Sequence, residues 1–171
     1  ATAPWAIAVI ASRESVDTVE NVLRSLVIAC NGIATRIDVL INGNGYLAQS
    51  LGQRLRSAPI DLGEEHQVCI WSFKLGDKAE TWNAYVHRLH PKANITFFID
   101  GYVQPEASSL RELAIALKDS EHTLAATGVP SLGRTAERHT KAMLREGGLQ
   151  GGLFALSSRA MEQIVHQGYR L

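Results

Sequence analysis

The sequence predicts a single α/β domain in which a mostly parallel β-sheet lies between two layers of helices, a three-layer α/β/α fold. Short continuous apolar runs, typical of strands buried on both faces, alternate with segments whose apolar residues recur at helical spacing. No fixed-period repeat, low-complexity tract or linker divides residues 1–171, so we expect one domain. A hydrophobic content of 46% is enough for an ordinary core.

The first half of the chain contains three predicted strand–helix units. Each strand is an apolar or nearly apolar run, and each helix carries apolar residues three and four positions apart. Asp17 and Glu20 are spaced like a capping box at the start of the first helix. The predicted strands are 5–11, 37–41 and 67–73, and the helical stripes that follow them are 19–30, 47–55 and 79–89.

The second half continues the alternation. Residues 95–99 form the clearest buried strand, and Pro105 is predicted to open the next helix. Gly168 is predicted to end the last helix. The remaining predicted elements are strands at 123–129 and 153–156 and helices carrying 110–117, 136–145 and 158–167.

The ends of the predicted strands indicate where a ligand binds. In parallel sheets ligands bind outside the carboxyl ends of the strands. We therefore expect the loops after Ala11, Ile41, Phe73 and Ile99 to share one crevice.

Charge and cysteine content exclude several classes of protein. Seventeen basic residues balance seventeen acidic ones, which argues against binding to nucleic acid or to an anionic membrane. No apolar run reaches the roughly 18 residues of a membrane span, and no signal sequence is visible. Cys30 and Cys69 lack zinc-site spacing and are too few for a disulfide framework, so a reducing, cytoplasmic location is expected.

Taken in order, the four loops resemble those of family 2 glycosyltransferases, which have the GT-A fold. The loop Ala11, Ser12, Arg13 and Glu14 matches the polar loop that lines the base and ribose of a nucleoside-diphosphate sugar. Asn42 stands where the family usually has an acidic residue. An amide can still hydrogen-bond a base edge, so the resemblance implies binding with an open base preference.

The segment 76–84 resembles the family's Gly-Lys-x-x-x-x-Asn-x-Gly motif. Lys78 and Asn83 occupy the corresponding positions. The resemblance implies that both contact the donor and that Lys78 neutralises a phosphate. A solvated surface lysine is the alternative interpretation.

Asp100, Gly101 and Tyr102, followed by Pro105, resemble the family's Asp-x-Asp motif and Pro-led helix. In the family this motif holds a divalent cation against the donor diphosphate. The resemblance thus implies Mn²⁺ or Mg²⁺ bound by Asp100, with Tyr102 replacing the usual second Asp. A turn-forming Asp without a ligand is the alternative.

The glycine-rich segment 147–153 resembles the family's turn near the sugar and the acceptor. Gly151 and Gly152 are the residues expected there, because glycine lets backbone approach a ligand closely. A flexible connecting loop is the alternative.

The resemblance implies an inverting glycosyltransferase that moves a sugar from a nucleotide donor to an unknown acceptor. Such a reaction needs a carboxylate base, which in the family lies shortly after the segment matched by residues 168–171. Three explanations stay open: the chain lacks its C-terminal acceptor part, another side chain serves, or the domain binds donor or acts as a scaffold without catalysis. Exposed apolar residues at such a flank predict a homo-oligomer.

Two other enzyme classes fit the sequence less well. A nicotinamide-binding oxidoreductase needs a Gly-x-Gly-x-x-Gly turn after the first strand, where residues 12–15 are Ser-Arg-Glu-Ser. A P-loop enzyme needs a Gly-x-x-x-x-Gly-Lys-Ser/Thr run, which is absent from the sequence. His87 and His90 lack a third ligand in reach, which favours a polar helix face over a metal pair.

Overall fold

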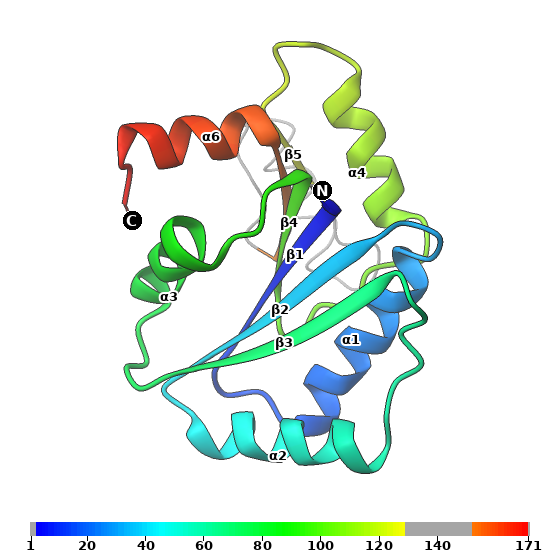
Figure 1. Cartoon of the computed structure of the whole chain (residues 1–171), viewed down its shortest axis with the longest axis vertical. Helices are drawn as coiled ribbons and strands as arrows, with labels where there is room; N and C mark the ends of the chain where they lie inside the picture. The colour runs from blue at the N-terminus through cyan, green and yellow to red at the C-terminus, as the bar shows by residue number, and fades with distance from the viewer. Residues whose placement is uncertain (1–2, 129–151, 171) are drawn as a thin grey trace, which may run out of the picture.

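The computed structural model describes residues 3–128 and 152–170, which form a six-stranded sheet in the order β3-β2-β1-β4-β6-β5 (Figure 1). Strands β1 to β4 are mutually parallel, and β6 runs antiparallel to its neighbours β4 and β5. The predicted mostly parallel sheet is confirmed. The strands are β1 (Ala3–Ala11), β2 (Thr35–Asn42), β3 (His66–Phe73), β4 (Ala93–Asp100), β5 (Ala125–Thr127) and β6 (Leu153–Ser157).

Helices cover both faces of the sheet, which confirms the three-layer fold. One face packs against three helices around the alternate side chains of β1 that include Ile7 and Val9. The other face, which includes Ala8 and Ile10, packs against the remaining helices. The first set is α1 (Val16–Ala29), α2 (Gly45–Ser57) and α4 (Ser109–Lys118), and the second is α3 (Lys78–Ala84), the π-helical turn η1 (Tyr85–Leu89) and α6 (Ser158–Gln167).

The starts of two helices differ from the prediction. The N-cap of α1 is Ser15, whose side chain accepts from the backbone N–H of Thr18, so the Asp17 capping box is wrong. Helix α4 begins after Ser108, and Pro105 lies in the loop before it. In both regions the apolar spacing locates the helix, but several nearby residues are suitable for its first turn.

The ends of two other helices can be compared with the prediction. The third predicted helix ends in the π-helical turn η1, closed by a hydrogen bond from the N–H of His90 to the carbonyl oxygen of Tyr85 at 2.8 Å. Gly168, with a φ of +67°, ends α6 as predicted. The helix predicted at 136–145 lies outside the described residues.

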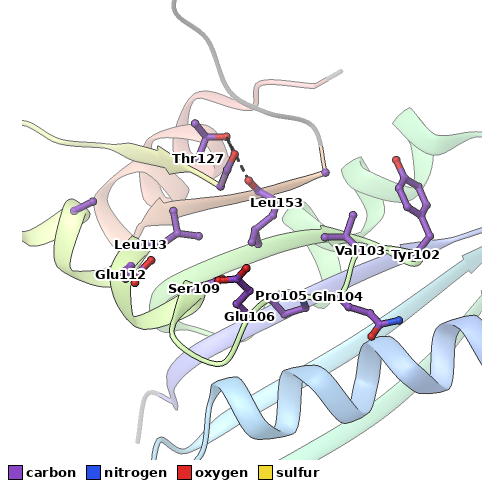
Figure 2. Close-up of a pocket in the computed structure, with 13 residues that line it drawn as sticks. Tyr102, Val103, Gln104, Pro105, Glu106, Ser109, Glu112, Leu113, Thr127 and Leu153 are labelled. Carbon is purple, nitrogen blue, oxygen red and sulfur yellow. Dashed lines mark hydrogen bonds between the residues drawn. The ribbon is translucent and has the colours of Figure 1, made fainter. Parts of the chain in front are cut away.

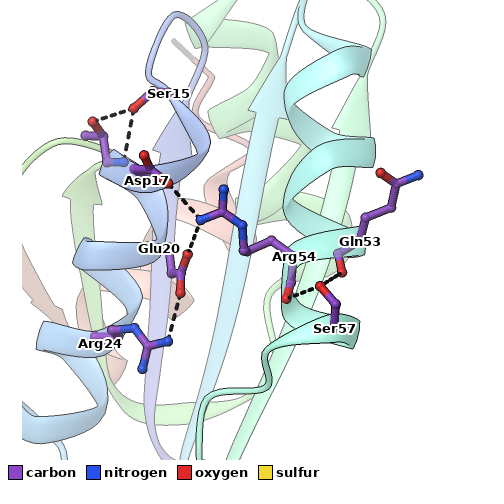
Figure 3. Close-up of polar contacts among 8 residues, drawn as sticks. Ser15, Asp17, Glu20, Arg24, Gln53, Arg54 and Ser57 are labelled. Carbon is purple, nitrogen blue, oxygen red and sulfur yellow. Dashed lines mark hydrogen bonds and ion pairs between the residues drawn. The ribbon is translucent and has the colours of Figure 1, made fainter.

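An ion-pair network joins the first turns of α1 to the last turn of α2 (Figure 3). The guanidinium of Arg54 on α2 lies 2.7 Å from Asp17 and 2.8 Å from Glu20, both on α1. Arg24 adds a 2.8 Å contact to Glu20. Hydrogen bonds from Arg24 and then Arg54 lower the pKa of Glu20 below its ordinary value. The network therefore fixes the two helices against each other most strongly when Glu20 is ionised.

A polar cluster is buried on the opposite face, beneath η1. Oδ1 of Asp38 accepts hydrogen bonds from Arg36, at 3.1 and 3.2 Å, and from the indole N–H of Trp71 at 2.8 Å. Oδ2 of Asp38 and the hydroxyl of Tyr85 are buried without a hydrogen-bond partner in the described part of the chain. Burial raises the pKa of Tyr85, so the phenol stays protonated.

His90 lies beside this cluster. Its Nε2 is 2.7 Å from the hydroxyl of Thr96 on β4. Burial, with a smaller contribution from the charge of Arg36, lowers the pKa of His90 to about 4. The imidazole is therefore neutral near pH 7.

Two expectations from composition can be compared with the structure. Cys30 is buried and Cys69 is half-buried, and both are free thiols. In the described part of the chain, no helix combines the length and the apolar character needed to cross a membrane.

Candidate functional site

Because β1 to β4 are parallel, the loops that follow them meet at one edge of the sheet. The loops after β1 and β2 are joined by two hydrogen bonds. The hydroxyl of Ser12 donates to the carbonyl oxygen of Asn42 at 3.0 Å, and the amide of Asn44 donates to the carbonyl oxygen of Ser12 at 2.7 Å. The side-chain oxygen of Asn44 also caps α2 by accepting from the N–H of Leu47. Asparagine is a favoured N-cap, because its side-chain oxygen can accept from the free N–H groups of the first turn.

Glycines let the other loops come equally close. Gly43 has a φ of +63°, and a Cβ there would lie 2.7 Å from the Cα of Gly76 in the loop after β3. A Cβ on Gly101 would lie 2.8 Å from the Cβ of Ala11. The N–H of Gly101 donates to the carbonyl oxygen of Ile10 at 2.7 Å. Larger residues at these positions would therefore push the four loops apart.

Asp100 is the buried carboxylate at the centre of this edge. It ends β4, and its Oδ1 lies 2.9 Å from Nζ of Lys78 at the start of α3. Its Oδ2 accepts a hydrogen bond from the hydroxyl of Tyr102 at 3.2 Å. The side chain of Asp100 is 12% exposed and that of Lys78 is 53% exposed. The structure thus brings together three of the predicted residues, with the side chain of Lys78 partly exposed.

Tyr102 is mostly exposed and keeps its proton at neutral pH. Partial burial is the main cause of its raised pKa, and the charges of Asp100 and Glu14 add to it. A protonated phenol donates a hydrogen bond but is a poor ligand for a hard cation.

These side chains do not fit a divalent cation as they are arranged. Such a cation prefers several oxygen ligands, with carboxylates supplying the charge. No group of three or more His, Cys, Asp or Glu side chains comes together within residues 3–128 and 152–170. Both oxygens of Asp100 already accept hydrogen bonds, and Glu14 accepts from the backbone N–H of Ser12 at 2.6 Å.

The other predicted donor-side residues lie around this centre. Arg13 is exposed in the loop after β1, whereas Asn42 is buried at the end of β2. Asn83 is buried on α3 and lines the same cavity as Lys78. This cavity, of about 390 Å³, is bounded by aromatic side chains of α3, β4 and β6, and Arg170 also lines it.

A second cavity, of about 590 Å³, lies beside Tyr102, between α4 and the strands β5 and β6 (Figure 2). Gly152 lines it, and the carbonyl oxygen of Gly152 accepts from the N–H of Asp100 at 3.0 Å. The carboxylates of Glu106 and Glu112 also line this cavity. Gly151, the other glycine predicted on the acceptor side, lies outside the described residues.

The two helical histidines have separate partners. Nε2 of His87 is 2.7 Å from the carbonyl oxygen of Tyr169, whereas His90 contacts Thr96. The two imidazoles therefore contact different elements, His87 the segment after α6 and His90 strand β4.

Comparison with known proteins identifies the fold. No protein-family profile and no curated protein sequence matches the chain. Among solved structures, the mannosyltransferase PcManGT from Pyrobaculum calidifontis, in complex with GDP-Man and Mn²⁺, matches 96% of the chain with a TM-score of 0.72 and 14% identity. Glucosyl-3-phosphoglycerate synthase from Mycobacterium tuberculosis, in complex with UDP, matches 92% with a TM-score of 0.60 and 20% identity. TarS 1–349 from S. aureus matches 76% with a TM-score of 0.55 and 12% identity.

The chain spans 47%, 57% and 37%, respectively, of these three structures. At such low identity the likeness concerns the fold, and membership of family 2 stays a prediction. The helices on both faces of the sheet, the strand order and these neighbours together show that the chain has the GT-A glycosyltransferase fold.

Proposed function

We propose that this chain is one domain that binds a nucleoside-diphosphate sugar at the carboxyl edge of its sheet and takes part in inverting transfer of the sugar to an acceptor. The observation that carries the proposal is the contact between Lys78 and Asp100 at the point where the loops after four parallel strands meet. The ammonium of a partly exposed lysine, held at a ligand-binding edge, is suited to a diphosphate.

The donor would lie across the four loops. Ser12, Glu14 and Asn42 line the end that would receive the base and ribose, because their loops are joined beside Asn44. Lys78 would contact the diphosphate, and Gly101 would let the donor approach the backbone. GDP-Man and UDP in the structural neighbours support a donor of this class.

In the proposed reaction, the bond between C1 of the sugar and the β-phosphate oxygen breaks and its electron pair stays on the departing diphosphate. The acceptor oxygen bonds to C1 from the opposite face, and its proton passes to a base. Lys78 would stabilise the charge that develops on the diphosphate. The cavity lined by Glu106 and Glu112 is the proposed place for the acceptor.

Three finer predictions accompany this proposal. Family 2 membership is supported by the loop motifs, and a cytoplasmic location by the two free cysteines. Mn²⁺ or Mg²⁺ as a cofactor is supported by the Mn²⁺ in two neighbour structures, but not by the side chains around Asp100.

The second candidate function is non-catalytic binding of a nucleotide sugar, or a scaffolding role. Tyr102 in place of a second Asp, and Asn42 in place of an acidic residue, favour this alternative. Release of free nucleoside diphosphate from UDP- and GDP-sugars distinguishes the two, because only an enzyme would release it faster than the uncatalysed rate.

Calorimetric titration of the purified chain with UDP, GDP, ADP, CDP and TDP tests donor binding. We expect one of these to bind, and Asp100→Ala to weaken it by roughly tenfold or more, since the variant removes the group that holds Lys78. Glu64→Ala, at an exposed loop position on the other edge of the sheet, is the matched control and should bind normally. Absence of binding to all five nucleotides would contradict the proposed function.

A further inference from the structure

We infer that the donor site works without a divalent cation, because the ammonium of Lys78 takes the cation's place and the hydroxyl of Tyr102 occupies the second oxygen of Asp100. This inference rests on the proposed donor site and concerns how that site neutralises phosphate. It is carried by the contacts of Asp100, Lys78 and Tyr102.

The carboxylate that would hold the cation is already engaged. Oδ1 of Asp100 lies 2.9 Å from Nζ of Lys78, and Oδ2 accepts from the hydroxyl of Tyr102 at 3.2 Å. Asp100 is also fixed by its backbone N–H, which donates to Gly152. A divalent ion at either oxygen would have to displace one of these donors and would lie close to the positive charge of Lys78.

Lys78 is arranged to receive an anion. Its ammonium has three N–H donors, and one contact to Asp100 leaves two for phosphate oxygens. The side chain is 53% exposed, so a ligand at the sheet edge can reach it. Asp77 caps α3 by accepting from the N–H of Glu80, which fixes the backbone beside Lys78.

Further positive charge lies near Lys78. Arg170 lines the same 390 Å³ cavity as Lys78. Its guanidinium is 3.7 Å from Glu80, and both side chains are 60% exposed, so the pair is loose. A diphosphate bound to Lys78 could therefore also recruit Arg170.

Tyr102 changes the chemistry at the position of the second Asp in the resemblance. A carboxylate there would attract a cation and repel phosphate, whereas the protonated phenol donates its single O–H to Oδ2 of Asp100. Replacing the acid by tyrosine thus removes one metal ligand and engages an oxygen of the remaining carboxylate, without adding negative charge beside the diphosphate.

Calorimetric titration with UDP and GDP, each in EDTA and in MnCl₂, tests the inference. We expect one nucleotide to bind in EDTA with an affinity within about threefold of that in Mn²⁺. Lys78→Met should lower that affinity by about tenfold to a hundredfold, the range of a charged hydrogen bond. Lys92→Met, at an exposed lysine in the loop just before β4, is the matched control and should bind normally. Thermal denaturation checks that each variant is folded.

A gain-of-function variant tests the same inference from the other side. The double variant Lys78→Met, Tyr102→Asp frees Asp100 from the ammonium and restores a carboxylate pair. We expect it to bind the nucleotide only with Mn²⁺, and to bind Mn²⁺ itself in electron paramagnetic resonance titrations in which the wild-type chain binds none.

Three outcomes separate this inference from the proposed function. Wild-type binding that requires Mn²⁺ would overturn the inference and leave the donor site intact. Equal affinity of wild type and Lys78→Met in EDTA would also overturn it. If the folded chain binds neither UDP nor GDP, with or without Mn²⁺, the inference is overturned. The proposal that the donor is a UDP-sugar or a GDP-sugar is then overturned as well.

Discussion

The two faces of the sheet differ in how they are packed. Among the described residues, the cluster beneath α1, α2 and α4 contains 24 buried apolar side chains, whereas that beneath α3, η1 and α6 contains seven. The second face also carries the buried Asp38, the histidine–threonine pair of His90 and Thr96, and the 390 Å³ cavity beside Lys78. The difference indicates that packing on the first face supplies most of the stability of the domain. The second face is less densely packed, and it places a cavity and polar groups next to the candidate site.

Adjacent phenylalanines on β4 test this division most directly. Phe97 belongs to the larger cluster and Phe98 to the smaller one, where it lines the cavity. We expect Phe97→Ala to lower the free energy of unfolding by about 3–5 kcal/mol. Phe98→Ala should cost less, about 2–3 kcal/mol, because the residue borders the 390 Å³ cavity and belongs to the smaller cluster. Urea denaturation measures both, and an equal or larger loss for Phe98→Ala would contradict the division.

The buried polar cluster is the next point at which the faces differ. Asp38→Ala should lower the free energy of unfolding by about 3 kcal/mol, since Arg36 and Trp71 lose their shared acceptor. Tyr85→Phe is the matched variant, and it should be neutral or slightly stabilising because the hydroxyl has no partner. Urea denaturation measures the free energy of unfolding of both variants. A loss above about 1 kcal/mol in Tyr85→Phe would mean that the hydroxyl is hydrogen-bonded, for example through a buried water to Asp38.

Acid should weaken the second face through His90. Its native pKa of about 4 lies below the ordinary 6.5, so between these values the unfolded chain binds the proton and the native state does not. Stability should therefore fall as pH decreases from 6.5 to 4, by about 2 kcal/mol after allowance for the partial exposure of the ring. His90→Gln should remove this dependence of stability on pH. The control His122→Gln, at an exposed histidine, should keep it. Thermal denaturation at several pH values measures both variants.

The ion pairs between α1 and α2 should have the smallest effect. Arg54 is 42% exposed, so Arg54→Met should lower the free energy of unfolding only slightly at neutral pH. The pKa of Glu20 is lowered in the native state, so its contribution is present above 4.5 and is lost as pH falls through the native value. The variant should flatten that part of the pH profile, whereas Arg56→Met on the same helix should not. If the dependence of stability on pH is unchanged in Arg54→Met, Arg24 alone lowers the pKa of Glu20.

Much of the fold could be predicted because buried parallel strands leave continuous apolar runs. Residues 95–99 are such a run, and β4 extends it by only a few residues. The start of α1 at Ser15 could not be fixed, because serine and aspartate are both good caps and lie two positions apart. The π-helical turn was missed for a different reason, since its apolar spacing fits an ordinary helix.

The residues of the candidate site were predictable one by one, but their contacts were not. Lys78 and Asp100 are 22 positions apart, and their pairing depends on α3 lying across the end of β4. The same holds for Asn44, whose bond to Ser12 spans 32 positions. Sequence motifs identified where the ligand should bind, whereas the sharing of both Asp100 oxygens by Lys78 and Tyr102 required the structure.

The position of β6 between β4 and β5 has a consequence for how the chain folds. β5 hydrogen-bonds to β6, which begins at Leu153, although β5 itself ends at Thr127. During synthesis at the ribosome, β5 must therefore wait for later residues before it joins the sheet, while β1 to β4 can already assemble. β5 should be the last strand to gain protection against amide hydrogen exchange during refolding, and the wall of the cavity beside Tyr102 would be completed only at that stage.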